Sequence, residues 1–586
     1  MASNATDGGL TGPGFELLVL ADFCGQGHPA HAGPVKVDKA SFDEVFSNFS
    51  PKLMFEVPDR IGRGKLPLPI DLGLQSMADF APLSILQRVD ALKGCLRAAR
   101  VLTGVTRGDT PIDAARAELG SCDLPDALHA KCTDVLADPG TRPGPQKPSD
   151  SEPTGSILSV VGMPGKGESP VQRDVDAFVE QLGIPRMEVA KSTVRQAAAL
   201  LLEEVCQGLH AQLDDILHDP AFQALESAWR GLRLLVSRTD FHQTSITINV
   251  AHCQREAVAE ALSTNLQSLQ DGGHVVDAAT ADFAFGESAG DVALLKELAV
   301  AGERYYCPVI AAASPSLLGV GKDADYARLS PSLRDRFDAP ELIEWRDFRR
   351  TDCANYVALV VPDVAGRPPY GPKTVPVADI AYCERDSTLW MRGAWLVATA
   401  ISQSVARTGW PLTFSGTDAG RVADLPVVAL ARTGSTVHLA AQCSWTDEQR
   451  AVLTSNGLMV IQARPNSTNV EIMSVPTLYD TSTAGAADAR EAMLHATLPY
   501  RLFANKVAQK LYPVLDTLSE GMSEDEIVTS IAGTLGALFD HPDVVRVAVA
   551  PAAEGSAGRQ VDVEIEPEFN ILGRRAELRL GFGIPG

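Results

Sequence analysis

Residues 282–313 read DFAFGESAGDVALLKELAVAGERYYCPVIAAA and set a strand, a helix and a second strand in succession. The apolar runs at the two ends suit buried strands, and the segment from Asp291 suits the helix between them. Outward from this stretch, TSITINV (244–250) alternates as a strand does, NYVALVVP (355–362) is another apolar run, and residues 388–408 suit a helix. This interleaving predicts an α/β core with a mostly parallel sheet.

Helices precede this core and short strands follow it. Residues 187–217 and 219–236 have helical patterns, and the second carries one apolar stripe through Trp229. At the C-terminal end RVAVA, QVDVEIEP and RAELRLGF alternate apolar and polar residues, which favours an antiparallel element and makes the class α+β overall. The apolar face of the last two of these strands carries Val561, Val563, Ile565, Leu578, Leu580 and Phe582. A two-stranded hairpin is marginally stable in water, so this face needs a partner sheet.

The charge balance excludes some classes of function. Lys and Arg number 51 and Asp and Glu 74 in 586 residues, a net charge of −23, which repels phosphate backbones and argues against nucleic-acid binding. The sequence predicts neither a signal peptide nor a membrane span. Ten cysteines stand singly without any C-x-x-C pair, so we expect buried thiols rather than disulfides or structural zinc.

A Pro/Gly/Ser-rich stretch predicts a linker. Eleven of the 18 residues in PGTRPGPQKPSDSEPTGS (139–156) are Pro, Gly or Ser. Such a stretch buries too little apolar surface to offset the entropy lost when a chain becomes ordered. We place the linker at 139–170, between an N-terminal region (1–138) and a C-terminal region (171–586). The latter divides into a helical part (171–240), an α/β core (241–540) and terminal strands (541–586). In the N-terminal region, FELLVLADF from Phe15 suits a buried strand.

An enzymatic alternative rests on Ser288. GESAG (286–290) matches G-x-S-x-G between a strand and a helix, the context that a nucleophile elbow needs. No HGGG-type segment precedes it, and none of the three downstream histidines lies in a Gly-rich terminal loop. A plain strand–turn–helix junction is the preferred interpretation, and we expect no catalytic residue.

Other chemical motifs are weak. Cys24, His28 and His31 form a single cluster, whereas structural zinc needs four ligands, so a solvated loop is preferred. The Gly/Lys segments at 162–169 and 319–325 lack the Ser or Thr of a phosphate loop, so no cofactor is predicted. The three arginines of EWRDFRRTD suit either a solvated face or a docking patch for an acidic partner; they are Arg346, Arg349 and Arg350.

Longer segments resemble a known family. ILHDPAFQALESAWRGLRLLV (216–236), GRPPYG (366–371) and LPYRLF (498–503) resemble the large subunit of the type VI secretion contractile sheath, and other segments follow in that family's order from about residue 171 to the C-terminus. FELLVLADF, VKVDKASFDEVFSNFSPKL and the MADFAP turn resemble the small, VipA-like sheath subunit. The two subunits look fused, small then large, through the linker.

The resemblance implies a contractile-sheath fold, with a mixed sheet core flanked by helices, and a cytoplasmic structural protein. It implies six-protomer rings in a helical tube around inner-tube hexamers, attached to a baseplate, with an AAA+ disassembly ATPase as a further partner. The six apolar residues of the last strands would then pair with a neighbouring protomer, and the three arginines could dock the tube or another partner. The alternatives are a serine hydrolase and a scaffold that does not polymerise.

One departure from the family concerns strand pairing. The family's small subunit has a further N-terminal strand, which pairs with neighbouring protomers. Here only MASNATDGGLTGPG precedes Phe15, and SILSVVG (156–162) is the candidate replacement.

Overall fold

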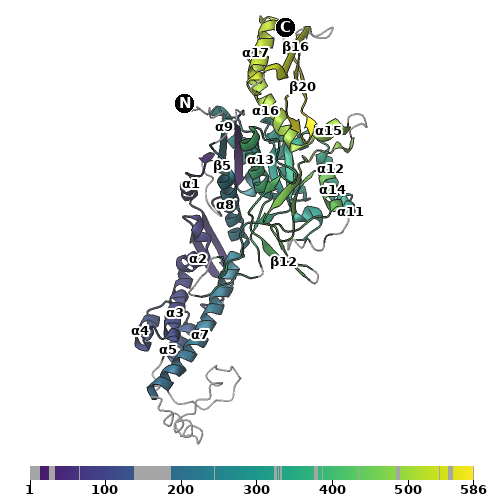
Figure 1. Ribbon diagram of the computed structural model, residues 1–586. Coiled ribbons are helices and arrows are strands. Elements are labelled where there is room, and N and C mark those ends of the chain that lie inside the picture. The colour runs from purple at the N-terminus through teal and green to yellow at the C-terminus, as the bar shows by residue number, and fades with distance from the viewer. Residues whose placement is uncertain are drawn as a thin grey trace, which may run out of the picture.

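A nine-stranded mixed sheet forms the body of the protein in the computed structural model (Figure 1). In sheet order the strands are β11 (Arg421–Val422), β15 (Val470–Ser474), β14 (Leu458–Ala463), β8 (Val357–Val361), β7 (Val309–Ala313), β6 (Ala278–Phe285), β1 (Phe15–Ala21), β5 (Ile246–His252) and β2 (Val35–Val37). The six strands from β14 to β5 are parallel, and β2 and β15 run antiparallel to their neighbours. The predicted α/β core with a mostly parallel sheet is confirmed.

The structure describes most of the chain in segments. They are residues 13–25, 33–64, 66–136, 186–242, 245–321, 326, 329, 333–374, 380–385, 387–432, 435–483, 489–519, 521–539, 542–551 and 559–584. The predicted linker, the SILSVVG segment, the Gly/Lys segment at 162–169, and His28 and His31 lie outside the described residues.

The N-terminal region supplies a central strand of this sheet. β1 lies between β5 and β6, and all seven of its residues are in register with residues of β5, from Phe15 opposite Ile246 to Ala21 opposite His252. Its side chains are buried on both faces, since Leu17 belongs to the hydrophobic core on one side of the sheet and Leu18 to the core on the other. The two sequence regions therefore share one body.

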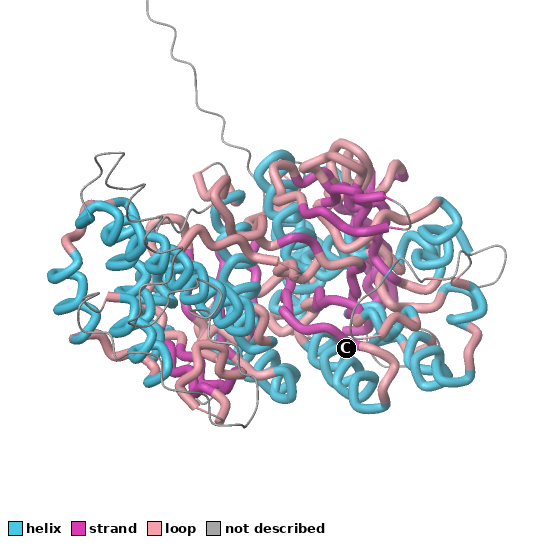
Figure 2. The backbone as a smooth tube through the Cα atoms, turned by 90° about the horizontal axis from the view of Figure 1, so that it is seen from below, coloured by secondary structure: helices cyan, strands magenta, loops and turns pink. Residues whose placement is uncertain are grey.

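Helices cover both faces of the sheet, as Figure 2 shows along the long axis of the molecule. The face that Leu17 enters packs against α8 (Pro220–Arg238) and α13 (Ala394–Thr408). The opposite core is formed with α9 (Val258–Asp271), α10 (Ala289–Arg304), α11 (Arg334–Phe337), α12 (Ile343–Arg349) and α14 (Asp447–Ser455). The apolar stripe predicted on α8 is confirmed, because these residues are at most 2% exposed: Phe222, Leu225, Trp229, Leu232 and Leu235.

A helical stalk extends from the body opposite the C-terminal end of the chain (Figure 1). Its elements are α2 (Pro82–Arg88), α3 (Asp90–Arg107), α4 (Ile112–Gly120), α5 (Asp126–Val135) and the long α7 (Arg186–Leu217). Nearer the body are α1 (Phe42–Phe49) and the hairpin of β3 (Lys52–Val57) and β4 (Leu68–Gly73). Among the described residues, no helix has the length and apolar character needed to cross a lipid bilayer.

A separate C-terminal module stands on the other end of the body (Figure 1). It contains α16 (Leu498–Leu515), α17 (Glu524–Gly536) and a three-stranded antiparallel sheet, β16 (Val545–Pro551), β17 (Arg559–Ile565) and β20 (Leu578–Ile584), around a third hydrophobic core. The predicted antiparallel element is confirmed. The module starts earlier than residue 541, because α16 and α17 cover the apolar face of its sheet.

Small elements connect these parts. They are α15 (Ala489–His495) and the paired strands β9 (Val364–Ala365) with β10 (Trp390–Met391), β12 (Val428–Arg432) with β13 (Ser435–Leu439), and β18 (Asn570–Ile571) with β19 (Arg574–Arg575). The helix predicted from residue 388 begins at Ala394, because Trp390 and Met391 pair with β9 instead.

Candidate functional site

The joint between the two sequence regions is built from buried aromatic side chains. It forms around Trp229 on α8, whose ring lies 4.9 Å from that of Phe23 and 4.3 Å from that of Phe46. The indole Nε1 donates to the backbone oxygen of Phe23 over 3.0 Å. Both phenylalanines come from the N-terminal region and are fully buried. Since aromatic pairs at such distances stabilise beyond simple burial, this cluster fixes how β1 and α1 sit on α8.

Glycine at position 231 permits α8 to pack closely against α13 within the C-terminal region. A Cβ atom there would lie 2.3 Å from the ring of Trp395 on α13, far inside contact distance. The indole Nε1 of Trp395 in turn donates to Asp282 Oδ1 on β6 over 2.7 Å. Burial raises the pKa of Asp282 to about 7, against the opposing charge of Arg392 and the bond from Trp395.

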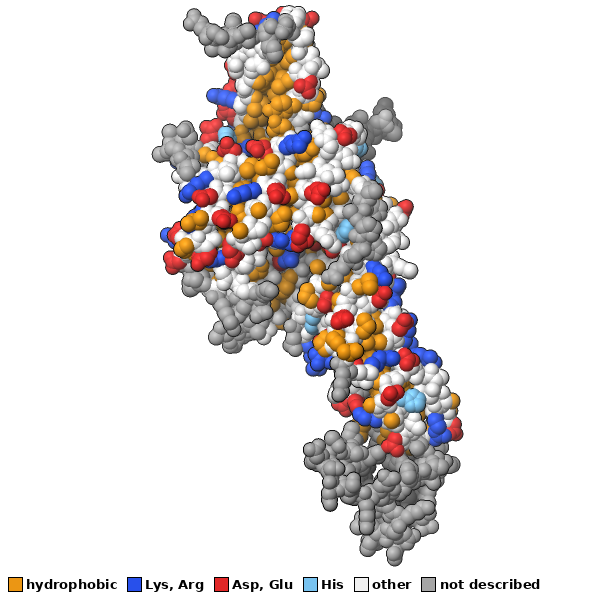
Figure 3. Space-filling model, turned by 180° about the vertical axis from the view of Figure 1, so that it is seen from behind, with side chains coloured by type: hydrophobic (Ala, Val, Ile, Leu, Met, Phe, Trp, Pro, Cys, Tyr) orange, Lys and Arg blue, Asp and Glu red, His pale blue; other side chains and the backbone are white. Residues whose placement is uncertain are grey.

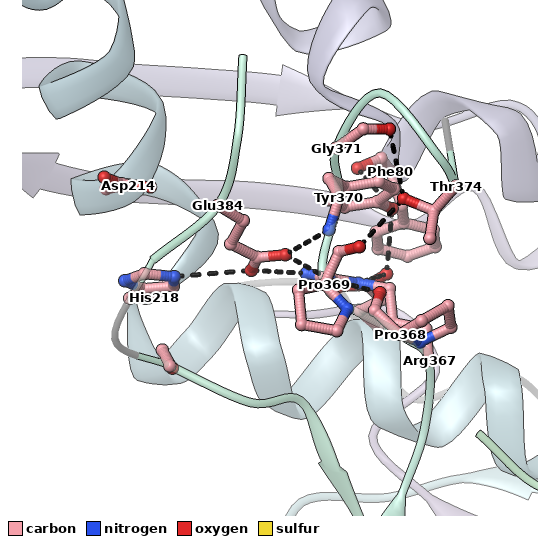
Figure 4. Close-up of polar contacts among 12 residues, drawn as sticks. Phe80, Asp214, His218, Arg367, Pro368, Pro369, Tyr370, Gly371, Thr374 and Glu384 are labelled. Atoms are coloured by element: carbon pink, nitrogen blue, oxygen red, sulfur yellow. Dashed lines mark hydrogen bonds and ion pairs between the residues drawn. The ribbon is translucent and has the colours of Figure 1, made fainter. Parts of the chain in front are cut away.

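A buried ionic cluster adjoins Trp229 on α8. Figure 4 shows part of it, the contacts of Arg367 with Glu384. Arg367, only 4% exposed, contacts Glu226 Oε1 on α8 through Nε at 2.9 Å and Glu384 through both terminal nitrogens at 2.5 and 3.0 Å. Arg230 lies one turn along α8 from Glu226 and contacts the same oxygen at 2.7 Å. Two carboxylates thus meet two guanidinium groups, which keeps the buried charge balanced.

The loop that carries Arg367 also reaches the N-terminal region. The guanidinium of Arg367 stacks 3.9 Å from the ring centre of Tyr370, whose hydroxyl lies 3.3 Å from the backbone oxygen of Phe80 and 3.3 Å from Glu226 Oε1. Burial raises the pKa of Tyr370 to about 12. One polar network therefore connects α8, the 366–371 loop and the η1 turn (Met77–Phe80) of the N-terminal region.

Glu384 extends the network to the base of the stalk. His218, just beyond α7, lies with Nε2 3.3 Å from Glu384 Oε1. Burial alone would raise the pKa of Glu384, but the hydrogen bonds from His218 and Arg367 and the charge of Arg367 outweigh it and lower the pKa to about 2. The carboxylate is therefore charged across the ordinary pH range, and its contacts hold the end of α7 on the body.

This cluster joins two sequence motifs that motif analysis did not connect. Glu226, Trp229 and Arg230 belong to LESAWRGL, and Arg367 and Tyr370 to GRPPYG. No local pattern in the sequence indicates that these two motifs are in contact. A glutamate next to the buried stripe of α8 was the available signal, because a charge in such a place requires a partner.

The structure places Ser288 at the start of a helix. Its hydroxyl accepts a hydrogen bond from the backbone N–H of Asp291 over 3.1 Å, and the carboxylate of Asp291 accepts one from the N–H of Gly286 over 2.7 Å. Ser288 is exposed, and Glu287 next to it contacts Arg336 at 3.2 Å. These are the interactions of a helix N-cap, so the GESAG turn is explained by local structure.

The three arginines of EWRDFRRTD lie in different environments. Arg349 is 4% exposed and donates to the backbone oxygens of Leu478 and Ser455. Arg346 is half-buried and donates to two backbone oxygens of residues 337–339. Arg350 is exposed and contacts Asp347 at 3.3 Å. Arg349 and Arg346 therefore hold α12 in place through hydrogen bonds to backbone oxygens. Arg350 is the arginine of this set whose side chain is exposed to a partner.

The six predicted strand-pairing residues lie on one face of the C-terminal sheet. Those of β17 and Leu578 are buried, while Leu580 and Phe582 on β20 are half-buried, and all six face the module's own helices. The predicted RVAVA strand is β16, which pairs with β17 along its whole length as a third strand. The predicted need for a partner sheet is wrong, because α16 and α17 of the same chain cover this face. β16 and β20 are the two edges of this sheet.

Metal or cofactor candidates are few. In the described part of the chain, one group of carboxylates is close enough to share an ion: Glu564, Glu566 and Glu577. Arg579 contacts Glu564, and Arg575 contacts Glu566, each at 3.1 Å, so salt bridges already neutralise this group. Burial raises the pKa of Cys24 to about 12, which disfavours the thiolate that a metal needs.

Comparisons with family models match two parts of the chain. The VipB family (EvpB/VC_A0108, tail sheath N-terminal domain) matches residues 200–479, and the VipA family (type VI secretion system, VipA, VC_A0107 or Hcp2) matches residues 13–119. The type VI secretion system sheath protein TssC1 of Pseudomonas aeruginosa is 27% identical over 463 residues, which cover 71% of this chain and 91% of that protein.

Solved structures give more distant matches. A chain of the anti-feeding prophage baseplate and one of its contracted helical sheath each match over 61% of this chain and 77% of their own, with TM-scores of 0.33 and 0.30 and identities of 13% and 12%. The sheath tail protein Lin1278 of Listeria innocua matches over 57% of this chain and 61% of its own, with a TM-score of 0.30 and 10% identity.

Proposed function

We propose that this chain, with small and large subunit regions in one polypeptide, is a type VI secretion sheath protomer. It polymerises as six-protomer rings around inner-tube hexamers on a baseplate. The observation that carries the proposal is the place of β1. A strand of the small-subunit region lies between two strands of the large-subunit region, so one chain builds a whole protomer. The cytoplasm is the compartment in which such a sheath would assemble.

The C-terminal module is the proposed contact between protomers. A space-filling view shows hydrophobic side chains gathered in a band on this module (Figure 3). β20 is an edge strand, and Leu580 and Phe582 on it are half-buried at the rim of the module's core. An edge strand beside partly exposed apolar side chains favours addition of a strand from another chain. The backbone of β20 would then form the hydrogen bonds to the added strand. The six apolar residues would form the buried face of the enlarged sheet.

Two further partners are proposed, an acidic protein and an ATPase. Arg350 is the proposed docking residue for an acidic partner such as the inner tube, because its guanidinium is exposed. An AAA+ disassembly ATPase is proposed as a partner from the family resemblance alone. We also propose that the protein has no catalytic activity, since Ser288 serves as a helix cap and the family is one of structural sheath proteins.

Electron microscopy of the purified protein tests the polymer. We expect long tubes, whereas a monomeric scaffold would give small particles. The edge is tested by Phe582→Lys, which places a charge where an added strand would extend the apolar face. Phe582→Ala controls for the lost packing, and Gly581→Lys places the same charge on the opposite face of β20, where a Cβ would meet only the ends of two side chains.

We expect tubes from both controls and none from Phe582→Lys, while the circular dichroism spectra of all three variants match the unmodified protein. Tubes of normal length from Phe582→Lys would show that the edge of β20 does not join protomers. Absence of tubes from the unmodified protein with its tube partner present would overturn the proposed polymer itself.

A further inference from the structure

The C-terminal module is attached to the body through α16, whose residues are divided between two hydrophobic cores. Leu498 and Leu502, at its start, pack into the core of the body, whereas Phe503 and Val507 pack into the module's own core. The N–H of Leu498 also donates to the backbone oxygen of Val475, at the end of β15, over 2.9 Å. The start of α16 is therefore fixed to the body. A second apolar attachment comes from Trp410, just beyond α13, whose ring packs in the module's core against Phe503 and Phe539.

Beyond its first turn, α16 contacts the body through a buried ion pair. Lys506 Nζ lies 2.7 Å from Asp277 Oδ1, and the two side chains are 9% and 5% exposed. The other oxygen of Asp277 accepts a hydrogen bond from the N–H of Glu16 over 2.7 Å. Asp277 precedes β6 and Glu16 lies in β1, so one carboxylate connects the module with strands from both sequence regions. The contact lies at the amino ends of these parallel strands, which we call the amino edge of the sheet.

One turn further along α16, Gln509 makes a second polar contact with the same edge. Its side-chain Nε2 lies 2.9 Å from the backbone oxygen of Val276, 3.3 Å from that of Tyr305 and 3.2 Å from that of Tyr306. The ring of Tyr306 stacks on that of Tyr512, with centres 5.1 Å apart. The body's side of this contact is thus made largely of backbone oxygens and one carboxylate.

Polar and apolar contacts respond differently when they are pulled apart. Separating an apolar core exposes surface that water solvates poorly, whereas an ammonium group and a carboxylate recover their hydration when they part. Two buried polar atoms of this helix, Asn505 Nδ2 and Gln509 Oε1, have no hydrogen-bond partner among the described residues and would gain one from water. When a force pulls the module away from the body, the contacts of Lys506 and Gln509 with the sheet edge should therefore break first. Both hydrophobic cores should stay closed at that point.

We propose that Lys506, Gln509 and Asp277 form a releasable latch that sets the angle between the C-terminal module and the body. With the latch closed, the module is held on the amino edge of the sheet. With it open, the module turns about its two apolar attachments, the first turn of α16 and Trp410, while its core stays intact. This inference rests on the proposed contact between protomers through the module, because that contact supplies the load.

Hydrogen exchange on the purified full-length chain tests the latch without polymerisation. Lys506→Met removes the ammonium and keeps the aliphatic stem, and Gln509→Leu removes the contacts to the three backbone oxygens while the ion pair stays. Lys510→Met is the matched control, since Lys510 is exposed on the same helix. In both latch variants we expect amides at 276–278 and 305–307 to exchange at least about tenfold faster, while β17 keeps its protection.

Three results would overturn the latch. These are unchanged exchange at the sheet edge in both latch variants, an equal effect in Lys510→Met, and loss of protection in β17 together with the sheet edge. The last would mean that the ion pair holds the module folded rather than oriented. Electron microscopy separates this inference from the proposed function. A chain that forms no tubes contradicts the function while the exchange result still decides the latch, and tubes of Lys506→Met should contain more contracted particles than those of Lys510→Met.

Discussion

Cutting the linker should leave the two regions of the protein together. A protease site placed within residues 139–156 would separate the chain into a small-subunit piece and a large-subunit piece without touching any described element. The reason is β1, which pairs with strands on both sides, and whose large apolar side chains are at most 3% exposed. These side chains are Phe15, Leu17, Leu18, Val19 and Leu20.

The strength of this attachment can be worked from the burial. Five large apolar side chains contribute roughly 10 kcal/mol when buried. The aromatic cluster at Trp229, with Phe23, Phe46 and Phe49, contributes a comparable amount. Association of two free pieces costs on the order of 10 kcal/mol. The remainder corresponds to a dissociation constant below about 100 nM.

Size-exclusion chromatography at about 1 μM protein is the assay. We expect the cut chain to elute as one species that separates into two bands only in denaturing gels. Val19→Asp is the matched variant, because it places a charge in the body core and should let the pieces separate once cut but not before. Elution of the small piece by itself from the cut, unmodified protein would refute the assignment of β1 as a permanent part of the sheet.

Further predictions concern single side chains. Arg367→Met should lower the free energy of unfolding by about 3–5 kcal/mol, measured by urea titration, because it leaves two buried carboxylates facing one guanidinium. Asp282→Asn should stabilise the protein by about 2–4 kcal/mol at pH 8 and by little at pH 4, since the raised pKa of about 7 means that stability is present at low pH and lost as pH rises through 7. Thermal melts across pH 4–8 would show this slope, and a pH-independent difference would contradict it. Ser288→Ala should lose a helix cap, about 1 kcal/mol, and keep assembly and background ester hydrolysis unchanged; stoichiometric labelling of Ser288 by a fluorophosphonate probe would contradict its structural role.

Local patterns predicted most of the elements because each depends on neighbours in sequence. The helix at 220–238 and its stripe follow from the 3.6-residue period, and the strands at 246–252 and 559–565 from alternation. Arg349 could not be placed in this way. Its burial depends on the backbone oxygens of residues 455 and 478, more than a hundred residues away, which no local pattern reveals.

The ionic cluster could not be predicted from the sequence for a related reason. Glu226 and Arg367 are 141 residues apart in sequence, and only the close approach of α8 and the 366–371 loop makes them a pair. The position of β1 was equally hidden. Its apolar sequence fixes that it is a strand buried on both faces, but an apolar strand carries no mark of which two strands it will join.

The place of β1 also gives the fusion a physical consequence for folding. The crossover from β5 through α9 leads to β6, and without β1 these strands would leave a gap of one strand, with two unpaired edges facing each other. Unpaired edges beside apolar side chains are sites of aggregation. Because β1 precedes both partners in the chain, it is already synthesised when β5 and β6 emerge and is tethered near them. Fusion thus replaces a bimolecular search for the missing strand with an intramolecular one at the step where the large-subunit region is most exposed.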